Sequence, residues 1–192
     1  MKEELLEQAD GLARSRLSGK RYTHVLGVAD TAERLARAHG LPPERARLAA
    51  LLHDVARESG PEELLRSAER YGVEADGFTK ERPMLLHGPV AAEEARRGLG
   101  IEDTEVLEAV RVHTTGAPGI GPLALAVYVA DKIEPGRDYP SVGRLRELAG
   151  KDLTEAAAAI LRATEAHNQD RDRPTHPDSR RMLAWLEART GR

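Results

Sequence analysis

The stretch that decides the fold is ARLAALLHDVAR at residues 46–57, in which an apolar helical run ends on a histidine and an aspartate. Apolar residues recur at helical spacing up to Leu52, and the polar pair His53-Asp54 follows directly on this run. Burying even a neutral polar group without a partner costs roughly 2–7 kcal/mol. The pair therefore needs a partner, which the rest of the sequence must supply.

Four more residues with metal-binding side chains fall in segments that otherwise read as apolar helix: His24, His87, His113 and Asp131. His113, for example, follows Val106 and Val110 at positions i, i+4 and i+7 of one stripe. A lone core histidine is more often hydrogen-bonded to a carbonyl than bound to a metal, and a lone His-Asp pair carries little information. Six such residues in one chain favour a metal centre that holds two ions.

Imidazole and carboxylate ligands suit iron, manganese, cobalt, nickel or zinc, and they disfavour calcium or a magnesium-only site. Four histidines and two aspartates exceed the needs of one tetrahedral ion. They suffice for two divalent ions with Asp54 as the bridge, and they leave positions open for water and substrate. Two metals about 3.5–4 Å apart can clamp a phosphoryl group and hold a hydroxide for in-line attack.

The composition fits one ordinary enzyme domain. The chain has 192 residues and a net charge of −3, which argues against general nucleic-acid binding. It contains no cysteine, so disulfides and thiolate zinc sites are excluded. The N-terminal MKEELLE is unlike a signal peptide, and no apolar run approaches the roughly 20 residues that span a bilayer. We expect a cytoplasmic protein with no membrane partner.

Helical periodicity and capping residues predict an all-α domain. One apolar stripe runs over 25–36, and the next helix is expected from Pro43 through Ala56. Further helices are expected at 61–71, 84–98, 103–113, 122–134, 141–149, 153–168 and 177–189. Two irregular segments lie beside candidate ligands, where a substrate would be gripped: 72–82 and 114–122.

The order His…His-Asp…His…His…Asp resembles the HD-domain superfamily of metal-dependent phosphohydrolases, and His87 and His113 match its dinuclear branch. Five segments look like the YqeK-type family of bacterial symmetrical bis(5′-nucleosyl)-tetraphosphatases: RYTHVLGVADTAERLA (21–36), ARLAALLHDVAR (46–57), LLHGPVAAEEA (85–95), VRVHTTG (110–116) and YVADKIEPGR (128–137). The resemblance implies an HD-domain helical bundle of about eight to ten helices. It also implies a single HD domain over 1–192, with a core of about 16–165 and a C-terminal helical extension at 166–192.

The same resemblance implies cleavage of diadenosine tetraphosphate into two ADP by a hydroxide held between two metal ions, with iron as the expected metal. Its ligand sets would be His24, His53, Asp54 and Asp131 for one ion, and Asp54, His87 and His113 for the other. Asp54 is thus a catalytic candidate shared by both ions. Manganese, cobalt, nickel and zinc are alternatives, because sites of this kind do not select one metal by raw affinity.

Positive charge is needed where the ADP oxyanion leaves, because phosphoryl transfer depends on positioning and electrostatic stabilisation. Arg137 is the first catalytic candidate, since its planar fork suits bidentate phosphate contact, and Arg57 is another. The substrate-binding candidates are Arg21, Thr114, Thr115, Gly116, Lys132 and Arg137. Two features depart from the family pattern: Arg57 stands where lysine is usual, and APGIGPL at 117–123 replaces a more usual methionine and small hydroxyl residue.

Other activities use similar ligands. A nucleotidase or dNTP phosphohydrolase would use the same centre and would differ in its products. Diiron oxygenases of the HD fold bind O₂ instead, but the basic residues downstream of Asp131 favour phosphate. A non-catalytic nucleotide sensor is disfavoured because all six ligands are present. A homodimer is a further expectation, and the candidate core or dimer contacts are Met182, Leu183, Trp185 and Leu186.

Overall fold

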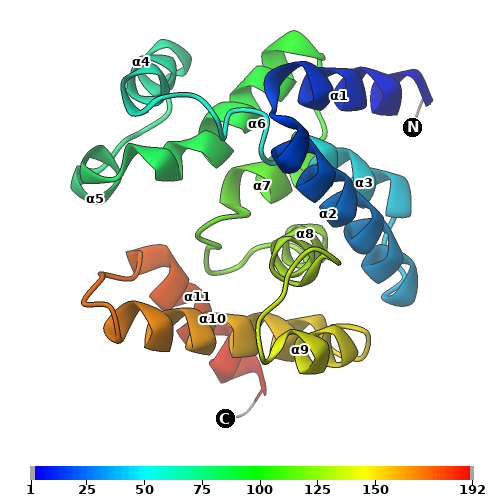
Figure 1. The fold of residues 1–192 in the computed structure, drawn as a ribbon, viewed down its shortest axis with the longest axis vertical. Coiled ribbons are helices and arrows are strands. Elements are labelled where there is room, and N and C mark those ends of the chain that lie inside the picture. The colour runs from blue at the N-terminus through cyan, green and yellow to red at the C-terminus, as the bar shows by residue number, and fades with distance from the viewer. Residues whose placement is uncertain (1–2, 191–192) are drawn as a thin grey trace.

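Helices account for all regular secondary structure in residues 3–190, the part of the chain that the computed structural model describes (Figure 1). The predicted all-α class is confirmed. In chain order the elements are α1 (Glu3–Arg16), α2 (Gly19–Ala38), α3 (Pro43–Leu52), α4 (Pro61–Tyr71), α5 (Gly77–Glu81), the 3₁₀ helix η1 (Pro83–Leu86), α6 (His87–Gly98), α7 (Thr104–Val112), α8 (Pro122–Ile133), α9 (Val142–Ala149), α10 (Leu153–Gln169) and α11 (Pro177–Thr190).

Most predicted helix ends agree with the structure to within one or two residues, and one clear difference falls beside the His-Asp pair. The prediction that this helix continues through Ala56 was wrong, because α3 ends at Leu52. Beyond it the chain runs in tight turns, in which the amide of Arg57 donates to the carbonyl of Asp54 at 2.8 Å. The pair therefore stands at a helix end rather than inside a helix.

A second difference concerns the residues before His87. The helix expected at 84–98 begins as the 3₁₀ helix η1 and becomes α-helical only at His87. The irregular segment 72–82 contains the short helix α5, which the periodicity did not predict. The Asp76 side chain starts this helix by accepting a hydrogen bond from the Thr79 amide at 2.8 Å. The described chain therefore has eleven α-helices, more than the eight to ten expected.

The central helix of the bundle is α8, whose residues from Leu123 to Ile133 are all buried except Lys132. Helices α2, α3 and α7 pack against it on one side and α10 packs on the other (Figure 1). A helix that is apolar all round is expected to be buried in this way. Because α8 is central, Asp131 near its C-terminal end is carried into the interior of the molecule.

The first and last helices add to the core. Ala9 and Ala13 of α1 are fully buried, and α1 packs against α3. Met182 and Leu186 of α11 are also fully buried, and α11 packs against α10, so these two residues are core residues. The predicted boundary between core and C-terminal extension falls inside α10. None of the described helices is long and apolar enough to cross a membrane.

Candidate metal centre

All six predicted ligands meet in the interior of the bundle: His24, His53, Asp54, His87, His113 and Asp131. They come from α2, the turn after α3, the start of α6, the turn after α7 and the last turn of α8. Five of the six are buried, and the His24 side chain is only 12% exposed. Segments far apart in the sequence therefore build one polar cluster inside an apolar core.

His24, His53 and Asp131 form what we call the first ligand group. Their ligand atoms all lie within 4.8 Å of one another. Nε2 of His24 is 3.1 Å from Oδ1 of Asp131, and Nε2 of His53 is 3.9 Å from the same oxygen. Three donors that converge on one point from three elements are the arrangement expected around an ion.

Asp54, His87 and His113 form the second ligand group. Nε2 of His87 lies 3.2 Å from Oδ1 of Asp54 and 3.0 Å from Nε2 of His113. The other oxygen of Asp54, Oδ2, faces the first ligand group, at 3.6 Å from Nε2 of His53 and 3.9 Å from Nε2 of His24. Each oxygen of this one carboxylate is therefore directed at a different ligand group.

Three of the four histidines are oriented by their own helices. His53, His87 and His113 each place Nδ1 against the backbone carbonyl three residues earlier, at 2.6, 2.5 and 2.8 Å. A ring that donates from Nδ1 is the tautomer with a lone pair on Nε2, the atom that faces the cluster. Carbonyl contacts of this kind are typical of metal-binding histidines.

His24 is oriented by a side chain instead. Its Nδ1 lies 3.1 Å from Oε1 of Glu134, a buried glutamate. Burial lowers the pKa of His24, but the Asp131 and Glu134 carboxylates outweigh it, so that this pKa is raised. Sequence reasoning misses Glu134, which directly follows the end of α8 and stands three residues after Asp131.

The donor set fits divalent transition metals. Among the described residues, the Nε2 atoms of His24 and His53 are buried and have no hydrogen-bond partner. The 3.1 Å contact of His24 with Asp131 lies outside hydrogen-bond geometry, so it does not satisfy that nitrogen. Buried polar atoms normally have a partner. An ion would supply the missing partner for both rings, and imidazole with carboxylate is a donor set that such ions accept.

The charge states also suit a metal. Burial raises the pKa of Asp54 and Asp131, but the neighbouring imidazoles, and Lys132 beside Asp131, bring both pKa values well below their usual range. Burial lowers the pKa of His53, and it lowers that of His113 to about 4. At neutral pH these carboxylates are charged and these imidazoles neutral, which are the states that bind metal ions.

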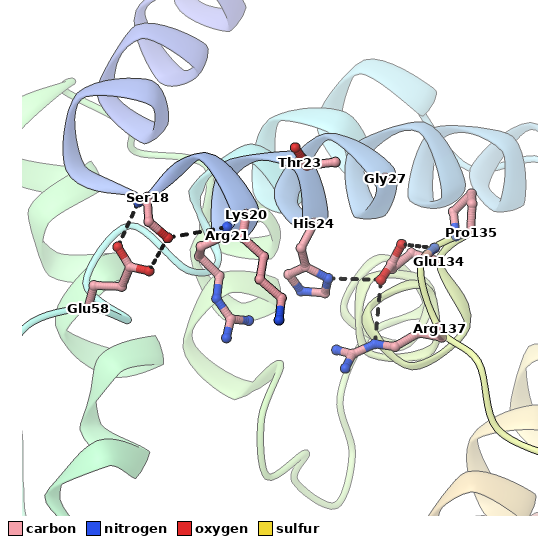
Figure 2. Close-up of a pocket in the computed structure, with 11 residues that line it drawn as sticks. Ser18, Lys20, Arg21, Thr23, His24, Gly27, Glu58, Glu134, Pro135 and Arg137 are labelled. Carbon is pink, nitrogen blue, oxygen red and sulfur yellow. Dashed lines mark hydrogen bonds and ion pairs between the residues drawn. The ribbon is translucent and has the colours of Figure 1, made fainter.

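A cavity of about 860 Å³ opens beside His24. Figure 2 shows three cationic side chains that project toward the same space: Lys20, Arg21 and Arg137. Lys20 is a lining residue that sequence reasoning misses, since a lysine in the first turn of a charged helix looks like an ordinary surface residue. The cavity thus combines one edge of the ligand cluster with positive charge.

The two arginines also contact candidate ligands directly. Arg137 donates to both the backbone carbonyl and the carboxylate oxygen Oδ1 of Asp131, each at 2.9 Å. Arg21 donates to Oδ2 of Asp54 at 3.1 Å. The structure therefore brings two of the three predicted arginines to the cluster, one beside each aspartate.

Two more of the predicted substrate-binding residues reach the cluster. The Thr114 hydroxyl lies 3.2 Å from Nε2 of His87 and 3.0 Å from Nε2 of His113, next to the second ligand group. Nζ of Lys132 is 2.5 Å from Oδ2 of Asp131. Both contacts are with atoms of predicted ligands, so these two side chains are positioned to influence whatever the cluster binds.

Three predicted residues lie elsewhere. Thr115 and Gly116 line a separate cavity of about 350 Å³. Gly116 has a φ of 65°, and a Cβ there would lie 2.1 Å from the sulfur of Met182, so only glycine fits. Arg57 is half-buried and is not among the residues that line the larger cavity. The roles assigned to these three residues stay predictions.

The sequence matches the family model of the HD domain over residues 21–136. It is 35% identical to the symmetrical bis(5′-nucleosyl)-tetraphosphatase of Bacillus subtilis, over 94% of this chain and 96% of that protein. A protein of the same name from Halalkalibacterium halodurans is 36% identical over 88% of this chain and 89% of its own length. The crystal structure of a predicted HD superfamily hydrolase involved in NAD metabolism, from Clostridium acetobutylicum, matches with a TM-score of 0.92 and 34% identity, covering 95% of this chain and 97% of that one. The chain therefore belongs to the HD-domain family, in the branch of the symmetrical bis(5′-nucleosyl)-tetraphosphatases.

Proposed function

We propose that this protein cleaves diadenosine tetraphosphate symmetrically into two ADP at a centre of two divalent metal ions. The observation that carries the proposal is the position of Asp54, whose two oxygens face different ligand groups beside a cavity with three cations. Relatives that match nearly the whole chain bear the name of this activity. The cations favour a phosphate substrate over the O₂ and chelating substrates of the diiron oxygenases.

In this proposal the first ligand group holds one ion, the second ligand group holds the other, and Asp54 is shared between them. Divalent ions in such a centre activate water for attack and offset the charge of the phosphates. Iron is the expected metal. Manganese, cobalt, nickel and zinc accept the same donors, and zinc or nickel binds such sites more tightly than iron does.

The chain's own cations would hold the polyphosphate. Symmetrical cleavage adds the oxygen of one water to a central phosphorus and breaks its bond to the central bridging oxygen, which leaves with the second ADP. Arg137 faces the cavity from the Asp131 side and Arg21 from the Asp54 side, so the two can contact phosphates on either side of the cut. Their planar forks suit phosphate oxygens, and Lys20 adds a third positive charge.

The test is an assay of metal-replete protein with diadenosine tetraphosphate, in which products are separated by chromatography. ADP as the sole nucleotide product is expected. AMP together with ATP would contradict symmetrical cleavage, and absence of turnover with iron, manganese and cobalt would contradict the substrate. A parallel assay with dNTPs and nucleoside monophosphates tests the nucleotidase alternative, which would release tripolyphosphate or phosphate.

Metal analysis tests the number of ions separately. Protein reconstituted without oxygen is expected to bind two equivalents of iron per chain. One equivalent in fully active protein would contradict the dinuclear centre while leaving the substrate assignment intact. The cytoplasmic location, the absence of a nucleic-acid partner and the homodimer stay predictions from the sequence.

A further inference from the structure

The turn that follows α8 is clamped by an arginine from outside the metal centre. Arg146, in α9, donates from Nε to the carbonyl of Ile133 at 2.8 Å. Its Nη2 donates to the carbonyls of Glu134 and Arg137, at 2.8 and 3.1 Å. The last carbonyls of a helix lack partners within the helix and carry partial negative charge, so a guanidinium is well suited to bind them. One side chain thus fixes both ends of the segment 134–137.

This segment carries a buried carboxylate that is held from two sides. Oε2 of Glu134 accepts a hydrogen bond from the Gly136 amide at 2.5 Å, and Oε1 lies 3.1 Å from Nδ1 of His24 (Figure 2). Helix α2 approaches closely because residue 27 is glycine. A Cβ at Gly27 would lie 2.8 Å from Oε2 of Glu134. The carboxylate therefore has one well-defined position, which depends on where the turn lies.

The orientation of His24 depends on a side chain, whereas the orientation of the other three histidines depends on backbone carbonyls. Backbone carbonyls of the adjoining helices hold the rings of His53, His87 and His113. His24 lies in the second turn of α2, where nearby carbonyls are engaged by the helix itself. Glu134 is the partner that its Nδ1 has, so a shift of this carboxylate would free the ring to rotate.

We propose that Arg146 is a positioning residue for the metal centre: by clamping the 134–137 turn it holds Glu134 against His24, and thereby sets the affinity of the first ligand group for its ion. The proposal rests on the metal centre of the proposed function. Loss of a residue that orients a metal-binding histidine typically weakens metal affinity about 10–100-fold. A clamp with a purely structural role would lower thermal stability and leave metal affinity unchanged.

The decisive variant is Arg146→Met, which removes the donors and keeps much of the apolar stem. The matched control is Arg144→Met, an exposed arginine on the same helix. Apo protein would be titrated with Co²⁺ and followed by its visible absorption, and thermal unfolding would be measured without metal. We expect Arg146→Met to bind one of two Co²⁺ ions about 10–100-fold more weakly, with the other ion and the control unaffected. Unchanged affinity for both ions in folded Arg146→Met would overturn the proposal.

Arg146→Lys provides a second variant should the methionine variant fold poorly. A lysine keeps the positive charge at the end of α8, but a single ammonium cannot reproduce a fork that spans three carbonyls. We expect an intermediate loss of affinity for the same ion. Wild-type affinity in Arg146→Lys would show that charge alone suffices, and it would overturn the positioning role of the fork.

A double-mutant cycle tests the route through Glu134. If Arg146 acts on His24 by way of this carboxylate, then Glu134→Ala combined with Arg146→Met should bind the first ion no more weakly than Glu134→Ala alone. Fully additive losses would overturn that route. Glu134→Gln retains an oxygen acceptor for Nδ1 and should restore part of the affinity that Glu134→Ala loses.

Failure of the positioning role can be distinguished from failure of the proposed function. Wild-type protein that binds two ions but does not cleave diadenosine tetraphosphate would contradict the substrate and leave the role of Arg146 intact. Wild-type protein that cleaves the substrate, alongside an Arg146→Met variant with wild-type affinity for both ions, would contradict only the role of Arg146.

Discussion

His53, His87 and His113 are oriented by the helices that carry them, whereas His24 is oriented by a carboxylate 110 positions away in the sequence. Each of the three is the first residue after a helix or 3₁₀ helix, where unpaired carbonyls are available to its Nδ1. His24 stands inside α2, where they are not, and it depends on Glu134. Local structure therefore suffices for three of the imidazoles, and the fourth needs the assembled fold.

The largest loss of metal and activity is expected at Asp54, which faces both ligand groups and so does not depend on how any one histidine is oriented. Asp54→Asn removes the negative charge of a carboxylate that faces both ligand groups and replaces one of its two acceptor oxygens with an NH₂ donor. We expect loss of both ions and a fall in tetraphosphate hydrolysis of at least about 10³-fold, because several kcal/mol of metal catalysis disappear. Metal analysis and product chromatography check this. Asp30→Asn, at an exposed aspartate of α2, is the control and should behave as wild type.

Removal of a single histidine should affect one ligand group and leave the other able to bind its ion. His113→Ala is expected to lose the ion of the second ligand group and to retain the other, while His24→Ala should do the reverse. Turnover should be largely abolished in both variants, because each leaves one ion where two are required. Spectroscopic titration with Co²⁺ separates the two cases. If one His113→Ala chain bound two ions and turned over normally, the two-group description would be refuted.

A substitution at Arg137 tests whether the cationic side chains bind the substrate, independently of metal binding. Arg137→Ala should leave the metal content unchanged and lower kcat/KM for diadenosine tetraphosphate by about 10–100-fold, the value of one charge-assisted hydrogen bond of 1.5–3 kcal/mol. Arg144→Ala is the matched control. Kinetics identical to wild type would remove Arg137 from substrate binding, and a loss of metal would instead assign its main role to the contact with Asp131.

The meeting of the six candidate ligands could be predicted from sequence because each breaks an apolar helical pattern, and that signal needs no knowledge of the fold. The helix ends were also predictable where proline, glycine or an acidic cap marks them, as at Pro61 and Gly121. The end of α3 at Leu52 was not, because the apolar pattern continues through Val55 and Ala56. The turns that follow α3 depend on packing, and no capping residue in the sequence marks them.

The surroundings of the ligands were predictable only in part. Thr114 follows a candidate ligand directly and does contact the cluster, but Thr115 and Gly116 line a separate cavity. Glu134 and Arg146 make contacts that join segments distant in sequence, and their residue types are common on helix surfaces. Sequence patterns reveal which residues are unusual where they stand, and they do not reveal which ordinary residues the fold brings to an unusual place.

The smallest expected effect comes from Gly27→Ala, which changes neither a candidate ligand nor Glu134 itself. It tests the comparison most directly, because it acts on His24 only by displacing the Glu134 carboxylate. Gly27 and Gly11 both lie inside helices, where glycine costs about 1 kcal/mol relative to alanine. A Cβ at Gly11 meets nothing within 4 Å, so Gly11→Ala should raise the free energy of unfolding by about 0.4–1 kcal/mol and leave metal affinity unchanged.

Gly27→Ala gains the same helical preference, but its Cβ would lie 2.8 Å from Oε2 of Glu134 and must displace that carboxylate from His24. We expect a smaller gain in stability than for Gly11→Ala, together with a loss of about 10-fold in affinity for the first ion only. Urea unfolding without metal and Co²⁺ titration measure the two effects. Equal stabilisation with unchanged affinity would mean that His24 keeps its orientation without Glu134. In that case the contrast between His24 and the other three histidines would disappear.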